Sequence, residues 1–489
     1  MMEFDIPYVY YARYYSHKYN LKNRTPEPVT HEQVLQWKRQ CEAEIAKRGL
    51  QFHDMGHGWT AEPFGLNSVE GWSVDDQSTI TEDQKQYLAM LNGVRELRNG
   101  VALNTNVCMS NPKVRSMMVK SIVDYAEKHQ NVDYLHVWLA DGSRNHCECE
   151  NCQKARPSDF YLMIMNELDE ALTAKKLDTR IVFIAYVDTL FAPEKEIIRN
   201  SKRFSLLYAP IYRSYTSSIR EDDAIPEPLP YLRNAWKRPR SSQENLALLR
   251  EWQKGWKGPS FCYEYHFWRA QYSDPGHLYL ARRIYEDVRS LRCMKLDGIV
   301  EDGSQRSFFP NGFLVYIYAE TLMNRDCDFD AVTEDYFSHI YGKEWKTAHA
   351  VLQKLTDAFD FGYMTGEKSE DRTHSPYYAP SHVADLEKVA AIAEEERAFA
   401  KEHLAMEDRP KTVSMRLLLR HADYCEGLAR VLIETAKGND EKAYELYRDF
   451  LADFGKYELE LERYYDQGLA GVCLRKLVKP AKMSLIEGL

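Results

Sequence analysis

Two groups that could do chemistry lie close together in residues 135–152, which read LHVWLADGSRNHCECENC. The first is Asp141, a carboxylate that directly follows an apolar run. The second is a set of three thiols, Cys147, Cys149 and Cys152, in the pattern C-x-C-x-x-C. A carboxylate at the end of a buried strand is suited to acid–base or nucleophilic catalysis, and clustered thiolates are suited to binding a metal ion. The stretch therefore predicts a catalytic carboxylate and a metal site in one loop.

Glu264, in the β-rich run 260–267 (SFCYEYHF), is the predicted catalytic partner of Asp141. Because side chains alternate along a strand, Glu264 would point inward while Tyr263 and Tyr265 point the other way. Glycoside hydrolysis uses two carboxylates: one protonates the leaving oxygen, and the other stabilises or attacks the anomeric carbon. We predict that Asp141 and Glu264 face each other in one pocket, at the roughly 5–5.5 Å of retaining enzymes.

Each of these assignments has a structural alternative. Asp-Gly is a turn signal, so Asp141 could serve as a turn cap, and Glu264 could form a buried ion pair with Arg13. The residues do not decide which carboxylate is the acid and which the nucleophile. If Glu264 is not catalytic, Asp302 is the next predicted partner of Asp141.

Aromatic, amide and charged side chains at the predicted strand ends are suited to binding sugar rings and hydroxyls. The chain offers no nucleophile elbow, no phosphate-binding glycine loop and no H-E-x-x-H helix. Three tryptophans among these residues are predicted to line the mouth of a barrel, where at least one stacks on a sugar. The predicted substrate-binding residues are Arg13, His57, Trp59, Asn106, Trp138, Tyr208, Tyr212, His266, Trp268 and Asp302.

The three clustered thiols predict a structural zinc site that pins the loop after Asp141. Zinc sites of this kind close with four ligands, and the fourth would be Cys108 or His146. A closed thiolate site leaves no open position, so we expect no metal in the catalytic step and no cofactor required for catalysis. The alternative is that Cys147, Cys149 and Cys152 are reduced thiols in a tight loop.

A parallel barrel would bring these side chains together. Eight short β-rich runs alternate with helical patterns, at 7–11, 50–55, 101–107, 134–140, 180–187, 203–209, 260–267 and 297–302. This alternation predicts an α/β fold, a (β/α)8 TIM barrel, whose active site lies at the carboxyl ends of the strands. An open doubly wound sheet is the alternative, but no G-x-G-x-x-G supports its dinucleotide-binding form.

Beyond residue 327 the pattern is helical throughout. We therefore predict a catalytic barrel at 1–327 and an all-helical C-terminal domain at 328–489, which stabilises the barrel.

Composition narrows the classes of partner. The 489 residues carry a net charge of −10 and no basic stripe, so nucleic acid is not an expected partner. No uncharged run approaches the length of a membrane span, and the first residues lack the pattern of a signal peptide. The ten cysteines are mostly scattered, as expected of reduced thiols in a cytoplasmic protein. The expected partner is an oligosaccharide substrate; the oligomeric state is left open.

Three motifs resemble glycoside hydrolase family 163. They are DG followed by CECENC, the YEY of residues 263–265, and NGFLVYIYAETLMNRDCDFDAVTEDYFSHIYG at 311–342. The similarity runs from about residue 5 to residue 345. It implies an endo-β-N-acetylglucosaminidase acting on N-glycans, a retaining enzyme in which the acetamide of the substrate can serve as nucleophile while one carboxylate orients it.

Two other functions remain as alternatives. The segment YIYAE…YFSHIYG is also similar to α-glucuronidases, which would need cations for the uronate; Arg13, His57 and Arg213 are the candidates. A non-catalytic carbohydrate-binding barrel is the third possibility. A hydrolase requires two carboxylates that face one pocket, and a binding protein does not.

Overall fold

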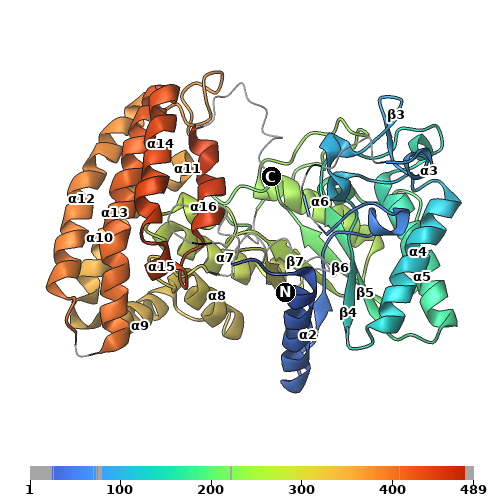
Figure 1. Cartoon of the computed structure of the whole chain (residues 1–489), viewed down its shortest axis with the longest axis horizontal. Coiled ribbons are helices and arrows are strands. Elements are labelled where there is room, and N and C mark those ends of the chain that lie inside the picture. Colours follow the sequence, from blue (N-terminus) through green and yellow to red (C-terminus); the bar gives the residue numbers. More distant parts are fainter. Residues whose placement is uncertain are drawn as a thin grey trace.

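The computed structural model describes residues 25, 27–69, 71–72, 74, 80–220, 223–304, 306–406 and 408–478. The predicted strand at 7–11 and Arg13 lie outside the described residues. An α/β part occupies one side of the molecule and a set of long helices the other (Figure 1).

The α/β part is built on one sheet of six parallel strands, in the order β1-β4-β5-β6-β7-β8. The crossovers contain α4 (Pro112–Lys128), α5 (Pro157–Ala174), α6 (Ser242–Gly255) and α7 (Leu278–Met294). The strands are β1 (His53–Asp54), β4 (Tyr134–Val137), β5 (Arg180–Tyr186), β6 (Phe204–Ala209), β7 (Ser260–Glu264) and β8 (Ile299–Glu301).

The sheet curls, so that side chains of distant strands meet on its concave face. The rings of Trp138, just after β4, and Tyr263 on β7 lie 5.7 Å apart between centroids, and His53 on β1 lies 5.9 Å from Phe261 on β7. Within the described residues the strands form a curled half-barrel and not the closed eight-stranded barrel that the sequence predicts.

The predicted strand at 101–107 is a short 3-10 turn, η4 (Ala102–Asn104), followed by an isolated bridge from Val107 to Leu88. The carbonyl of Leu103 accepts from the backbone N–H of Asp141, and that of Asn104 accepts from the side chain of Asn145. The segment therefore holds the loop after β4 and does not join the sheet.

The local sequence explains where helix α4 begins. Asn111 accepts from the N–H of Lys113 and Pro112 is the first helical residue, so α4 begins as the sequence predicts.

A hairpin that the sequence analysis did not predict joins β2 (Met90–Leu91) to β3 (Val94–Arg95). Its two turn residues, Asn92 and Gly93, have φ of 50° and 83°, as Asn-Gly hairpin turns require.

The C-terminal part is helical, as predicted. Its helices pack on α7 and on α8 (Phe313–Met323), and one hydrophobic cluster joins Phe313 and Ile317 of α8 to Phe337, Leu352 and Met415. This core crosses residue 327, where the domain boundary is predicted. The main helices are α9 (Phe329–Tyr341), α10 (Trp345–Phe359), α12 (Val383–Glu402), α13 (Arg409–Lys437), α14 (Asp440–Gly455) and α16 (Gln467–Leu474).

Among the helices that the structure describes, each is too short or too polar to cross a bilayer.

Candidate active site

Two carboxylates that interact through their charges lie at the carboxyl ends of the strands. Asp141 follows β4 and Asp302 follows β8. Burial raises the pKa of Asp302, and the negative charge of Asp141 raises it further, to about 7. Asp302 is therefore close to half protonated at neutral pH, which suits a group that donates a proton.

Hydrogen bonds fix Asp141 in this position. The hydroxyl of Tyr186, at the end of β5, donates to Asp141 Oδ1 over 2.9 Å, and Nε2 of His57 lies 4.0 Å from the same oxygen. The other ring nitrogen of His57 lies 2.7 Å from the carbonyl of Leu139. That carbonyl can only accept, so Nδ1 of His57 carries a proton.

The loop that carries Asp141 is tied to the segment before α4. Asp141 donates its backbone N–H to the carbonyl of Leu103 over 2.8 Å. The buried side chain of Asn106 donates to Asn145 over 2.7 Å and accepts from the N–H of Ala140 over 3.3 Å. Asn106 thus positions the loop after β4. Its side chain is buried and bonded within the protein, so the predicted contact of Asn106 with substrate is not supported.

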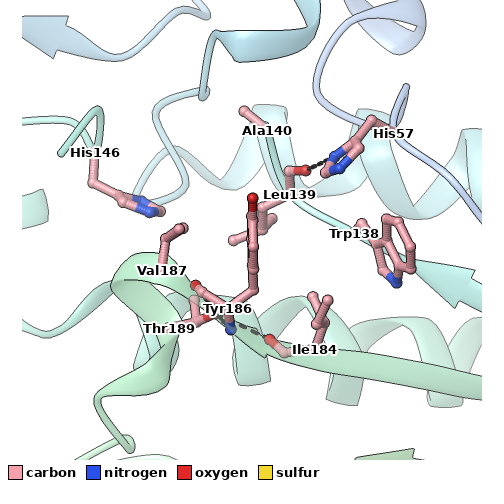
Figure 2. Close-up of a pocket in the computed structure, with 9 residues that line it drawn as sticks. All are labelled: His57, Trp138, Leu139, Ala140, His146, Ile184, Tyr186, Val187 and Thr189. Atoms are coloured by element: carbon pink, nitrogen blue, oxygen red, sulfur yellow. Dashed lines mark hydrogen bonds between the residues drawn. The ribbon is translucent and has the colours of Figure 1, made fainter. Parts of the chain in front are cut away.

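A small hollow of about 10 Å³, with room for about one water molecule, lies beside these groups (Figure 2). Its walls include His57, Trp138, His146 and Tyr186. The indole N–H of Trp138 and Nδ1 of His146 are buried and have no hydrogen-bond partner among the described residues. Such groups are costly unless something fills their hydrogen-bonding capacity, so the hollow suits a polar occupant.

The concave face beside the hollow is aromatic. Trp138 and Tyr263 belong to one cluster with Val182, Ile184 and Leu207 of the neighbouring strands. Tyr265 stacks edge-on against Tyr263 with 5.2 Å between ring centroids, and the charges of both Asp302 and Asp141 act on its pKa. The two tyrosines on either side of Glu264 therefore point into the concave face.

The prediction that Glu264 points inward is wrong, because Tyr263, its neighbour on β7, occupies the concave face. Alternation along β7 places Glu264 with Cys262 on the opposite face, against α7, and only 2% of Glu264 is exposed. Its oxygens accept from Arg213 over 2.8 Å and from the hydroxyl of Tyr215 over 2.7 Å. Glu264 forms a buried ion pair, the alternative considered above, with Arg213 as the partner.

The ion pair extends into a buried network. Arg213 also donates to Asp287 over 2.6 Å, and Asp287 lies 2.9 Å from Nε2 of His266. Nδ1 of His266 lies 2.8 Å from Glu301. Burial alone would lower the pKa of His266, but the charges of Glu301 and Asp287 and the hydrogen bonds to them raise it to about 10. His266 is fully buried in this network, so the predicted contact of His266 with substrate is not supported.

Two other predicted binding residues, Trp59 and Tyr208, lie elsewhere, whereas Tyr212 lies near Tyr186 and stays a predicted binding residue. Trp59 is fully buried in the core behind the sheet and donates to the carbonyl of His136 over 3.0 Å. Tyr208 is also fully buried, on the outer face, and donates to the carbonyl of Asn245. Both predictions fail because Trp59 and Tyr208 pack toward the helices. Tyr212 packs against Trp236, with 5.8 Å between ring centroids.

Trp268 and Asp302 remain at the site. The guanidinium of Arg269 stacks over the ring of Trp268 at 4.1 Å, and its charge lowers the pKa of Asp302. The C-terminal segment approaches here as well. Burial raises the pKa of Cys473 to about 11, the cations Lys476 and Arg269 act against this rise, and the charges of Asp466 and Asp302 add to it.

Several residues of the site were not predicted, namely Tyr186, Tyr263, Tyr265 and Arg269. Tyr186 ends β5 and shares the concave face with Val182 and Ile184. The pairing of β4 with β5 sets Val137 opposite Phe183, and alternation along β5 from there places Tyr186 on the same face as Trp138.

The four predicted cysteines gather at one point. The sulfurs of Cys108, Cys147, Cys149 and Cys152 all lie within 4.8 Å of one another. His146 does not belong to this group.

Comparison with known proteins gives a family and two distant structural similarities. Residues 15–354 match the model of DUF4838, a domain of unknown function. No curated protein matches the sequence. A solved GH138 enzyme targeting pectin rhamnogalacturonan II has 9% identity and a TM-score of 0.41; the match covers 73% of this chain and 47% of that one. A mutant O-GlcNAc hydrolase of Thermobaculum terrenum has 11% identity and a TM-score of 0.35, with 76% of each chain covered. This chain thus spans about half the length of the first of these structures.

Proposed function

This chain belongs to the DUF4838 family, and we propose that it is a retaining glycoside hydrolase that cleaves β-N-acetylglucosaminide linkages in N-glycan-type oligosaccharides. The reaction type is supported by the carboxylate pair, and the sugar by the resemblance to glycoside hydrolase family 163. One observation carries the proposal: Asp302 is buried near Asp141 at the carboxyl ends of the strands, and burial, with the charge of Asp141 as the second cause, raises the pKa of Asp302 to about 7.

The two carboxylates take different roles in this reaction. Asp302, protonated, donates its proton to the glycosidic oxygen as the bond to the anomeric carbon breaks. The acetamide oxygen of the substrate attacks the anomeric carbon, and Asp141, held by Tyr186, orients the acetamide N–H. Water then opens the cyclic intermediate and gives its proton to Asp302, which restores the acid and retains the configuration.

The surroundings of the pair suit a sugar. Tyr263 and Trp268 are only partly buried, so their rings are the candidates to stack on the apolar side of a pyranose, and the unpartnered N–H of Trp138 offers a donor for a hydroxyl. The reaction needs no metal or cofactor at this position.

An α-glucuronidase has less support. Of its three candidate cations, Arg213 is 6% exposed and already bound by Glu264 and Asp287. Arg13 lies outside the described residues. His57 remains beside Asp141, where it is the one candidate placed to meet a uronate.

The test is turnover of a panel of aryl glycosides and an N-glycan oligosaccharide by the wild-type protein and three variants. Asp302→Asn should lose roughly 10²–10⁴-fold in kcat on the N-acetylglucosaminide, as expected when acid–base assistance is removed. Asp141→Asn should also lower kcat, because the acetamide is no longer oriented by a carboxylate. Asp178→Asn, at an exposed carboxylate before β5, is the matched control and should keep full activity.

A preference for the glucuronide would overturn the proposed sugar. Binding of oligosaccharide without turnover of any glycoside would overturn the enzymatic role in favour of a carbohydrate-binding protein. Inhibition by a thiazoline analogue of the cyclic intermediate is expected if the acetamide is the nucleophile, whereas a trapped ester on Asp141 would overturn that assignment.

A further inference from the structure

Four thiols from two separate parts of the chain converge beside the candidate active site. Cys147, Cys149 and Cys152 belong to the loop after β4, and Cys108 comes from the segment before α4. Their sulfurs lie within 4.8 Å of one another, and Cys108 Sγ is 3.7 Å from Cys149 Sγ and 3.9 Å from Cys152 Sγ. All four are free cysteines, so no disulfide accounts for the cluster.

The spacing of the sulfurs fits a single tetrahedral metal ion. A zinc–sulfur bond is about 2.3 Å long, which puts tetrahedrally arranged sulfurs about 3.8 Å apart. An iron–sulfur cluster would hold its thiolates farther apart because irons and inorganic sulfides lie between them. A mononuclear ion therefore fits the cluster better than an iron–sulfur centre.

The groups around the sulfurs are hydrogen-bond donors. The backbone N–H of Met90, on β2, lies 3.3 Å from Cys147 Sγ. The guanidinium of Arg95, on β3, lies 4.0 Å from Cys147 Sγ and 3.9 Å from Cys108 Sγ. The hydroxyl of Ser110 accepts from the Cys152 thiol over 3.0 Å, and it can donate to Cys108 Sγ at 3.6 Å or to Cys149 Sγ at 3.7 Å. Donors of this kind stabilise thiolates on a metal, and one cation offsets the excess negative charge of four thiolates on a divalent ion.

We propose that Cys108, Cys147, Cys149 and Cys152 bind one structural Zn²⁺, and that the β2–β3 hairpin forms its outer shell of donors. Four thiolates fill the coordination sphere, so the ion takes no part in the reaction. Three of the cysteines are buried, with 5% of Cys108 and 2% each of Cys147 and Cys152 exposed, and the site is closed to substrate. The proposal is independent of the proposed function, since metal content can be measured without an activity assay.

The test is elemental analysis of the full-length protein, purified without added chelator, together with single serine variants. The wild-type protein should carry one zinc ion per chain. Cys108→Ser and Cys149→Ser should each bind far less, whereas Cys41→Ser, at an exposed cysteine on α2 (His31–Lys47), should match the wild type. Absence of zinc from wild-type protein, or an iron content in its place, would overturn the proposal.

A second measurement does not depend on the folding of any variant. Wild-type protein stripped of metal and titrated with Co²⁺ should develop the visible absorption of a tetrahedral cobalt thiolate, saturating at one equivalent. The weak spectrum of an octahedral cobalt ion, without sulfur-to-metal charge transfer, would overturn the proposal.

Discussion

Asp141 and Asp302 interact through their charges although they follow strands that lie far apart in the order of the sheet, β4 and β8. The curl of the sheet makes this interaction possible, because it brings the ends of β4 and β8 closer together than their places in the sheet order suggest. The pKa of Asp302 therefore depends on a residue that is distant from it in the chain.

Removing the charge of Asp141 should lower the pKa of Asp302. Asp141 contributes to the raised pKa of about 7, second only to burial, so Asp141→Asn leaves burial as the main cause of the rise. The measurement is an NMR titration of the carboxyl carbon of Asp302 in wild-type protein, Asp141→Asn and the exposed control Asp178→Asn. An unchanged pKa in Asp141→Asn would show that the two carboxylates do not interact.

The pH dependence of catalysis should report the proton on Asp302. Above about pH 7 this proton is lost, so kcat/KM should fall as the pH rises through that value. Asp302→Asn should abolish this alkaline limb together with most of the activity. A profile that stays level to pH 9 would be incompatible with Asp302 as the acid.

The stability of the protein should also depend on this proton. A free aspartate has a pKa of about 3.9, so between about pH 4 and pH 7 the folded state holds a proton that the unfolded state has released. Asp302 therefore makes the free energy of unfolding decrease as the pH rises across this window. Denaturant unfolding of wild-type protein and Asp302→Asn should show a smaller decrease in the variant; equal slopes would contradict the assignment.

Glu264→Gln should destabilise the fold. The change leaves the buried Arg213 without one of its two carboxylate partners, and breaking a buried ion pair in this way costs roughly 3–5 kcal/mol. Glu170→Gln, in an exposed pair with Arg199, is the matched control and should cost less than about 1 kcal/mol. Chemical denaturation measures both, and equal midpoints for the two variants would contradict the buried network.

Substitution of Trp138 should change the KM for substrate, whereas substitution of Trp59 should change only the stability of the fold. Trp138→Phe removes an N–H beside the hollow and should raise KM, in addition to the stability lost by shrinking a buried side chain. Trp59→Phe leaves the buried carbonyl of His136 without its donor and should lower stability by about 1–3 kcal/mol while KM is unchanged. Steady-state kinetics and thermal unfolding of both variants are the measurements; a raised KM in Trp59→Phe would place that residue at the site after all.

Sequence patterns predict the sheet well where strands are long and apolar. The runs at 180–187 and 203–209 correspond closely to β5 and β6, whose residues are nearly all buried on both faces. The run at 101–107 also begins with apolar residues but is no strand, because its carbonyls bind the loop after β4. Which backbone groups pair over such a distance in the chain is not contained in local composition.

The candidate site was predicted in part for a related reason. Asp141 and the cysteines belong to a short stretch whose spacing constrains where they lie. Glu264 was misplaced because β7 ends in alternating aromatic and polar residues, so both faces of the strand offer plausible inward groups. The cation that binds Glu264, Arg213, comes from a different loop, and only the folded structure shows that it occupies the outer face.

The end of α16, which η10 (Arg475–Val478) follows, lies near Asp302: burial raises the pKa of Cys473, and the charge of Asp302 raises it further. The match to the family model ends at residue 354, well before this segment. A recombinant fragment cut at the end of that match would lack side chains that border the proposed acid. Any measurement on Asp302 accordingly calls for the full chain, because a fragment bounded by the family match would omit α16 and η10.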